Sequence, residues 1–257
     1  RGSYSRGKDV AEQVADKLGY ECIDRDVLIE ASEKYNIPEV KLVRAIEDAP
    51  SILDRLSYEK EDYIAYIQAA LLTHLQRDNV VYHGNAGQFF VKGVPHVLKV
   101  RIVADIEERV QWEVERAGIS SSEARRILEK DDTERRKWGL HFYGMDPADP
   151  QQYDMVIHIR SAAIGTLEAV EIIRQAVTSP QFKTTPESQR QMDDLALAAK
   201  VRIALIKLAP DVYVVARDGA VTVKSSSLHR QKGSEVRKIA EGIPGVRSVS
   251  FDGGGPN

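Results

Sequence analysis

The sequence predicts an α/β protein in which helices cover a parallel sheet, followed by a small α+β unit. Strands and amphipathic helices alternate over roughly the first two thirds of the chain, which is typical of a parallel sheet. A glycine-rich turn with the spacing G-x-x-x-x-G-K, from Gly2 to Lys8, opens the first helix. Beyond a polar, proline-punctuated segment the pattern changes to helix, hairpin, helix and strand. The 257 residues, 42% of them hydrophobic, suffice for one large domain or two smaller ones.

Composition excludes several classes of protein. A net charge of −3 provides no general attraction to nucleic acid, so no nucleic-acid partner is expected. The single cysteine, Cys22, excludes an internal disulfide and a zinc site built from cysteines. No apolar run approaches the length of a membrane span and no signal peptide is visible, so a cytoplasmic location is expected.

The glycine-rich turn has the features of a phosphate-binding loop. Glycines let backbone N–H groups turn toward phosphate oxygens, the helix N-terminus adds partial positive charge, and the lysine reaches the outer phosphates. The helix over 8–18 carries an apolar stripe and ends at Gly19. A strand is expected before the loop: it lies in residues that precede Arg1, or, as the less favoured alternative, the motif lacks it. A flexible N-terminal turn is the alternative. The candidate phosphate-binding residues are Gly2, Ser3, Tyr4, Ser5, Arg6, Gly7, Lys8 and Asp9.

A short strand over 19–23 ends at Asp24, where a carboxylate would orient or deprotonate an acceptor. In open α/β sheets, functional side chains gather at the carboxyl ends of strands. A cap for the next helix is a compatible reading of Asp24. Helices are predicted over 27–35, 38–47 and 58–76.

Two further strands, over 79–83 and 97–104, continue the alternation. The first leads into the turn that begins at Gly84, after His83, for which either a catalytic or a structural role is open. The second contains Arg101, whose charge within an apolar strand needs a partner, either a phosphate ligand or a buried carboxylate. A helix from Asp105 through Val114 follows directly.

A long charged helix begins at the capping pattern Ser120 to Glu123 and continues to Gly139. Its dense charge over 129–137 fits either a solvated face or a lid whose cations close over a phosphoryl group. Arg135 and Arg136 are the candidate lid cations. A strand over 153–159 and a helix over 164–177 complete this part.

Three segments are therefore predicted: a first domain over 1–178, a linker over 179–192 and a second domain over 193–252. The linker is polar, rich in proline and aperiodic. The second domain is predicted to contain a helix over 195–208, a hairpin over 212–224 that turns at Asp218-Gly219, a helix over 234–241 and a strand over 245–251.

The first domain resembles the cytidylate kinase-like branch of the nucleoside monophosphate kinases. The resemblance implies a P-loop α/β core with an acceptor-binding insertion and a lid, which moves the γ-phosphate of ATP to CMP or dCMP with Mg²⁺. The partners it implies are thus a nucleoside triphosphate and a nucleoside monophosphate. The matching features occur in family order: Gly2-x-x-x-x-Gly7-Lys8, Tyr20 to Asp24, Val80 to Gly84, Val100 to Ala104 with Arg109, Lys130-Asp131-Asp132 with Arg135, and Tyr153-Asp154.

The resemblance also implies roles for individual residues. Lys8, Asp24 and Arg135 are predicted to be catalytic. The nucleotide-binding set consists of the candidate loop residues together with Lys130 and Arg136, and the acceptor-binding set is Asp24, Gly84, Asn85 and Arg101.

Two departures from the family pattern support a second hypothesis. Asp9 stands where the family has a metal-coordinating hydroxyl, and a carboxylate there would bind Mg²⁺ directly or through water. Asn85-Ala86 stands where the family has Arg-Asp. The alternative to catalysis is therefore a catalytically impaired nucleotide-binding protein, a pseudo-kinase that acts as a sensor or interaction protein.

The second domain looks like a BON domain. The resemblance rests on its order of elements, on Val214 to Val223 around Asp218-Gly219, and on Ile243-Pro244-Gly245-Val246 before Val249. It implies an α+β fold, a regulatory or docking role, and a protein or lipid partner.

Overall fold

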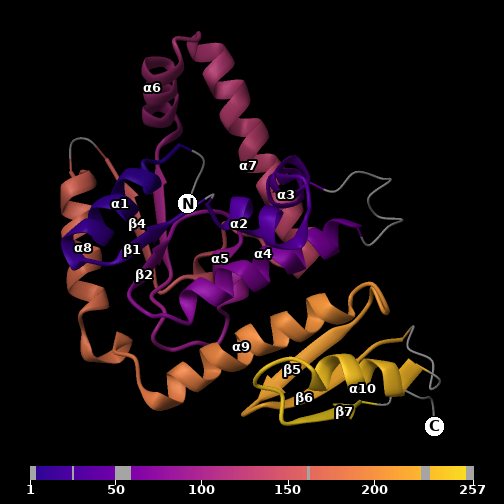
Figure 1. Cartoon of the computed structure of the whole chain (residues 1–257). Coiled ribbons are helices and arrows are strands. Elements are labelled where there is room, and N and C mark those ends of the chain that lie inside the picture. Colours follow the sequence, from indigo (N-terminus) through magenta and orange to yellow (C-terminus); the bar gives the residue numbers. More distant parts are fainter. Residues whose placement is uncertain (1–3, 25, 50–58, 161–162, 227–231, 253–257) are drawn as a thin grey trace. The chain divides into compact units, whose positions relative to one another are not determined.

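The computed structural model describes residues 4–24, 26–49, 59–160, 163–226 and 232–252. The chain packs into two compact units (Figure 1). The first consists of residues 1–26, 46–50 and 79–183, and the second of residues 27–45, 51–78 and 184–257. Residues on both sides of the predicted linker thus contribute to the second unit, since the described residues 27–45 and 59–78 belong with the C-terminal residues.

The first unit is an α/β structure. Its helices and strands are α1 Gly7–Leu18, β1 Glu21–Ile23, β2 Val80–Tyr82, α5 Gly87–Phe90, β3 Val100–Ala104, α6 Ile106–Ala117, α7 Ser121–Tyr143, η2 Pro150–Gln152, β4 Met155–Ile159, α8 Thr166–Val177 and η3 Pro180–Phe182.

The strands of the first unit pair in parallel, as the alternation of strands and helices predicts. β1 pairs with β2, and β3 pairs with β4. Within the described residues these are two separate two-stranded sheets rather than the single predicted sheet. One apolar core nevertheless joins them, because Val81 of β2 packs against the cluster that α1 and α8 form with β3 and β4. That cluster consists of Val10, Val14, Ile102, Ile157, Ile159, Ala169, Val170 and Ile173.

α1 forms because its apolar residues recur on one face. Val10 and Val14 are buried, while Lys8, Asp9 and Glu12 are exposed or partly exposed. The helix ends at Gly19, whose φ of 68° is the left-handed conformation that closes many helices. The predicted helix and its glycine cap are confirmed.

α6 and α7 form a helical hairpin (Figure 1). Val110, Ala124 and Leu128 are the buried contacts that hold the two helices together. Ser120 caps α7, because its hydroxyl accepts a hydrogen bond from the Glu123 N–H at 3.2 Å. This is the predicted cap.

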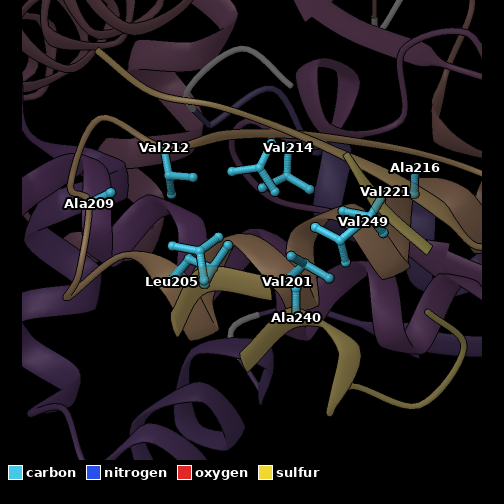
Figure 2. Close-up of a cluster of buried hydrophobic side chains, with 11 residues drawn as sticks. Val201, Leu205, Ala209, Val212, Val214, Ala216, Val221, Ala240 and Val249 are labelled. Carbon is cyan, nitrogen blue, oxygen red and sulfur yellow. The ribbon is translucent and has the colours of Figure 1, made fainter. Parts of the chain in front are cut away.

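The second unit combines a helical segment with the C-terminal α+β module. Helix α4 packs along α9, and α9 also covers one side of the sheet β5-β6-β7. Figure 2 shows the core of that module, in which small and branched apolar side chains of α9, α10 and the sheet meet. The elements are α2 Asp26–Tyr35, α3 Glu39–Glu47, α4 Glu59–Leu75, α9 Pro186–Leu205, β5 Tyr213–Arg217, β6 Ala220–Lys224, α10 Gly233–Glu241 and β7 Ser248–Phe251.

The hairpin turn of this module lies at the predicted residues. Asp218 and Gly219 have φ angles of 47° and 77°, the two positive values that a two-residue hairpin turn of type I′ requires. Among the described residues no helix is long and apolar enough to cross a membrane.

The start of α9 corrects the sequence-based prediction. The helix begins at Pro186, inside the predicted linker, instead of at Leu195. Thr185 and Ser188 cap it reciprocally, since the Ser188 N–H donates to Thr185 Oγ1 at 3.1 Å and the Thr185 N–H donates to Ser188 Oγ at 3.0 Å. Proline at the first helical position favours a helix start. Thr185 and Pro186, which lie within the predicted linker, therefore mark the beginning of α9.

Candidate functional site

The glycine-rich loop leads directly into α1. Tyr4 and Arg6 adopt left-handed backbone conformations, with φ of 56° and 55°. Ser5, between them, is buried, and its hydroxyl donates a hydrogen bond to the Ile102 carbonyl of β3 at 3.0 Å. The loop is thereby anchored to the strand that also carries Arg101. Gly2 and Ser3 lie outside the described residues.

Lys8, Asp24 and His83 form a charged group at the ends of β1 and β2. The Asp24 carboxylate lies 3.9 Å from Lys8 Nζ and 3.9 Å from His83 Nε2. Lys8 is also 3.5 Å from Glu12 on the next turn of α1. The His83 N–H donates to the Ile23 carbonyl at 3.1 Å, which holds the ends of the two strands together. Two of the predicted catalytic residues, Lys8 and Asp24, are therefore neighbours.

A cleft of about 330 Å³ opens in the first unit. Four arginines and two aspartates contribute to its lining, so guanidinium groups outnumber carboxylates. Aromatic side chains, the turn after β2 and Ser5 of the loop complete it. The lining residues are Ser5, Ile46, Gly84, Asn85, Ala86, Gln88, Phe89, Arg101, Val103, Ala104, Arg109, Asp132, Arg135, Arg136, Trp138, Asp146, Pro147, Ala148 and Tyr153.

An ion pair between the buried Arg109 and the partly exposed Asp132 connects the two helices of the hairpin at the cleft. Arg109 on α6 donates two hydrogen bonds to Asp132 on α7, at 2.8 and 3.1 Å. This bidentate geometry fixes both side chains. Arg109 is mostly buried, so this contact joins α6 to α7 beside the cleft.

The remaining arginines are more accessible to a ligand. Arg136 is 2.9 Å from Asp146 but is 68% exposed. Arg101 donates to the Ala148 carbonyl and lies over the Tyr153 ring, with its guanidinium carbon 5.9 Å from the ring centre. Burial raises the pKa of Tyr153, so its hydroxyl stays protonated at neutral pH.

The turn after β2 is shaped by Tyr82. Its hydroxyl donates to the Asn85 carbonyl at 2.9 Å. Ala86 takes a left-handed conformation, with φ of 68°, before α5 begins at Gly87. A Cβ atom added to Gly84 would lie 2.3 Å from the Tyr82 hydroxyl oxygen, so a larger residue there would force the ring or the turn to move. This turn brings Gly84 and Asn85 to the cleft.

The structure brings together many of the predicted site residues. Ser5, Gly84, Asn85, Arg101, Arg135 and Arg136 all line the cleft. Lys8 and Asp24 lie instead in the charged group beside His83, which directly precedes Gly84. Tyr4, Arg6 and Gly7 do not line the cleft, and Lys130 is exposed outside it. Their predicted roles stay predictions.

Asp9, the predicted metal ligand, is exposed in the first turn of α1. Among the described residues no group of three or more His, Cys, Asp or Glu side chains could hold a metal ion. Mg²⁺ in phosphoryl-transfer sites takes most of its ligands from phosphates and water, with one or two carboxylates. Asp9 is accessible but does not line the cleft, so its role as a metal ligand stays a prediction.

Sequence reasoning did not predict Asp146 and Trp138 as site residues, and Arg109 and Asp132 entered only through the family pattern. A usable signal exists for Arg109, which is a charged residue on the apolar face of α6 and thus needs a buried partner. No local signal marks Asp146, because it reaches the cleft from the loop after α7.

Comparison with known proteins gives a family and a fold. The model of the cytidylate kinase-like family matches residues 1–161. A search of the curated proteins found no match. A solved structure, of an uncharacterized protein from Eubacterium ventriosum ATCC 27560, is similar with a TM-score of 0.54 at 15% identity, covering 69% of this chain and 94% of that one. At this identity it shows the fold alone. The family model spans more than half of the chain and includes the loop, the charged group and all residues that line the cleft: the chain belongs to the cytidylate kinase-like family.

Proposed function

We propose that this protein transfers the γ-phosphoryl group of ATP to a nucleoside monophosphate of the CMP or dCMP type. One observation carries the proposal. The glycine-rich loop, through Ser5, the turn at Gly84 and the arginines of α7 contribute to a single cleft in which positive charge prevails. The family to which the chain belongs implies a nucleotide kinase type of function.

Electrostatics explains why such a cleft suits this reaction. The bond between the γ-phosphorus and the β,γ-bridging oxygen breaks, and a new bond forms to a phosphate oxygen of the acceptor. Charge spreads over the transferred group, so catalysis rests on positioning and on neutralisation by cations. In the proposal Lys8 holds the transferred phosphates, and Arg135 and Arg136 neutralise the charge from α7. Asp24 orients the acceptor, with Arg101 and Asn85. Mg²⁺, when bound, supplies further neutralisation, and Asp9 is the carboxylate that would contact it.

A direct assay tests the proposal. Turnover would be followed by coupled detection of ADP with ATP, Mg²⁺ and either CMP, dCMP, UMP or AMP. Arg135→Ala should lower kcat by about 10³-fold or more, the loss typical of a cation that stabilises transferred charge. Arg126→Ala is the matched control, because Arg126 is exposed on the same helix and does not line the cleft. No turnover on any acceptor would refute catalysis.

A second candidate function, nucleotide binding without turnover, is favoured by Asp9 and by Asn85-Ala86. Asp9 would bring a carboxylate toward the phosphates. Compared with the Arg-Asp of the family pattern, Asn85-Ala86 lacks a cation and a carboxylate on the acceptor side. A thermal shift separates the two functions, since a ligand at 100 times its dissociation constant stabilises a fold by about 2.7 kcal/mol. Stabilisation by ATP with no turnover would establish this second function.

The C-terminal module is proposed to be a BON-like regulatory or docking unit. Its helix, hairpin, helix and strand follow the predicted order, which supports the architecture. A protein or lipid partner is part of the proposal. Flotation of the full chain with phosphatidylglycerol vesicles tests for a lipid partner. Absence of binding would exclude a lipid of this kind and favour a protein partner.

A further inference from the structure

The backbone of the phosphate-binding loop takes a conformation that its own residues disfavour. Tyr4 and Arg6 have φ of 56° and 55°, in the left-handed region that glycine enters freely. For residues with a Cβ atom this region is strained, and it persists where the surroundings hold it. Contacts of the Tyr4 and Arg6 side chains are what could hold this strained backbone in place.

Both side chains lie against one face of α6. The Arg6 guanidinium carbon is 4.6 Å from the centre of the Trp112 ring. The Arg116 guanidinium carbon is 5.3 Å from the centre of the Tyr4 ring. Trp112 and Arg116 are four residues apart on a helix, so they are neighbours on its surface. We call these four residues the loop clasp.

The helix side of the loop clasp is itself fixed. Arg116 donates two hydrogen bonds to Glu113, at 2.9 and 2.6 Å, and Glu113 is buried. Trp112 is partly buried and packs against the apolar core of the first unit. On the other side of the loop, Ser5 is hydrogen-bonded to β3. Three consecutive loop residues, Tyr4, Ser5 and Arg6, are thus held by contacts with α6 and β3.

We propose that Trp112 and Arg116 are positioning residues of the phosphate-binding loop, whose affinity for a nucleoside triphosphate depends on the loop clasp. The inference rests on the proposed binding of nucleotide by this loop. Trp112 and Arg116 act through Tyr4 and Arg6, by keeping their backbone left-handed. The same hairpin, α6–α7, carries Arg135 and Arg136 into the cleft, so one element orders both the loop and the cleft.

A double-mutant cycle between Arg6 and Trp112 tests the inference. Trp112→Leu should weaken ATP binding by about 3- to 30-fold, the range expected for loss of a cation–π contact. Trp112→Phe keeps an aromatic face and should restore most of the affinity. Arg6→Gly makes the left-handed backbone unstrained, so Trp112→Leu in the Arg6→Gly background should change affinity by less than about 2-fold.

Two measurements are made on each variant of the cycle: its affinity for ATP and the hydrogen exchange of its loop amides. Titration calorimetry with ATP and Mg²⁺ gives the affinities. Hydrogen exchange of the amides of residues 5–9 in the ligand-free protein reports the loop without nucleotide, and should be faster in Trp112→Leu and unchanged in Trp112→Phe. Gln111→Ala, an exposed neighbour on α6, is the matched control.

The outcomes separate the inference from the proposed function. Trp112→Leu could weaken ATP binding equally in the wild-type and the Arg6→Gly backgrounds. That result would show that Trp112 acts through core packing alone, and would overturn the inference. Unchanged exchange and affinity in Trp112→Leu would overturn it as well. If the wild-type protein bound no nucleotide, the proposed function would fail, and the exchange rates would then decide whether the loop clasp holds the loop.

Discussion

At the scale of single residues, Gly84 is a cleft position where an added methyl group would meet a neighbouring ring. A Cβ atom at this position would lie 2.3 Å from the Tyr82 hydroxyl oxygen and 2.6 Å from its ring carbon. Either the ring or the turn must move, and the turn carries Asn85 into the cleft. We expect Gly84→Ala to raise KM for the acceptor about 10-fold or more with little change in KM for ATP, since misplacement by about 1 Å is costly.

Steady-state kinetics with each substrate varied in turn checks this expectation. Gly84→Ala combined with Tyr82→Ala should recover part of the loss, because removal of the ring makes room for the added methyl group. Gly233→Ala is a control, since an added Cβ there meets no atom within 4 Å. Equal changes in both KM values for Gly84→Ala would contradict a local effect on the acceptor side.

Asp62 on α4 predicts a pH dependence of stability. Burial raises the pKa of its carboxyl to about 6, while Arg202 on α9 lowers it and Glu61 raises it. The buried Oδ1 atom of Asp62 has no hydrogen-bond partner within the described residues. A folded-state pKa above the unfolded value means that the folded state binds the proton more tightly.

The contribution of Asp62 to stability is consequently fully present below about pH 4 and is lost as pH rises through about 6. Asp62→Asn should raise the free energy of unfolding at pH 7 by roughly 1 kcal/mol, a value reduced for partial solvent screening. It should also flatten the pH dependence between about 4 and 6. Urea unfolding at several pH values measures this, and a less stable variant at pH 7 would contradict it.

At the scale of elements, the start of α9 rests on its cap. Thr185 and Ser188 exchange two hydrogen bonds, at 3.0 and 3.1 Å. Thr185→Ala should lower the free energy of unfolding by about 1 kcal/mol, as loss of an N-cap does. Thr133→Ala should have no such cost, because Thr133 is exposed within α7 and alanine is the better helix former. Equal changes in the urea midpoint for the two variants would show that the cap is not the cause.

At the scale of the whole molecule, the sequence predicted most elements and the parallel pairing, because period and turn chemistry are local. Asp218-Gly219 and Gly19 lie where their conformational preferences place them. The partner of α4 was not predictable in this way, since nothing near Glu59–Leu75 encodes its packing against a helix more than 100 residues later. Likewise, Asp146 reaches the cleft only through the fold, whereas Arg101 and Arg135 could be selected from charge and family order.

The helices of residues 27–78, α2 to α4, are here called the inserted helices, and the packing of α4 on α9 joins them to the C-terminal residues. Gln76, at the end of α4, accepts from Lys200 Nζ at 3.1 Å through its side chain and from Gln189 at 3.1 Å through its carbonyl. Asp78 accepts a hydrogen bond from Thr184. Buried apolar residues of α4 include Ile64, Ile67, Leu71 and Leu72. Loss of α9 would expose part of this apolar surface to water, at roughly 25 cal/mol per Å².

A chain shortened to residues 1–183 should therefore bind a dye specific for exposed apolar surface and unfold at a lower temperature than the full chain. Proteolysis should cut it first within 27–78, because those residues lose their partner helix. Gln76→Ala in the full chain is the milder counterpart, with an expected loss of about 1 kcal/mol for the side-chain hydrogen bonds to Lys200 and Asp193. If the shortened chain resisted protease within 27–78 and bound no dye, the inserted helices would be stable without α9. The C-terminal module would then be a separable attachment to the kinase-like part.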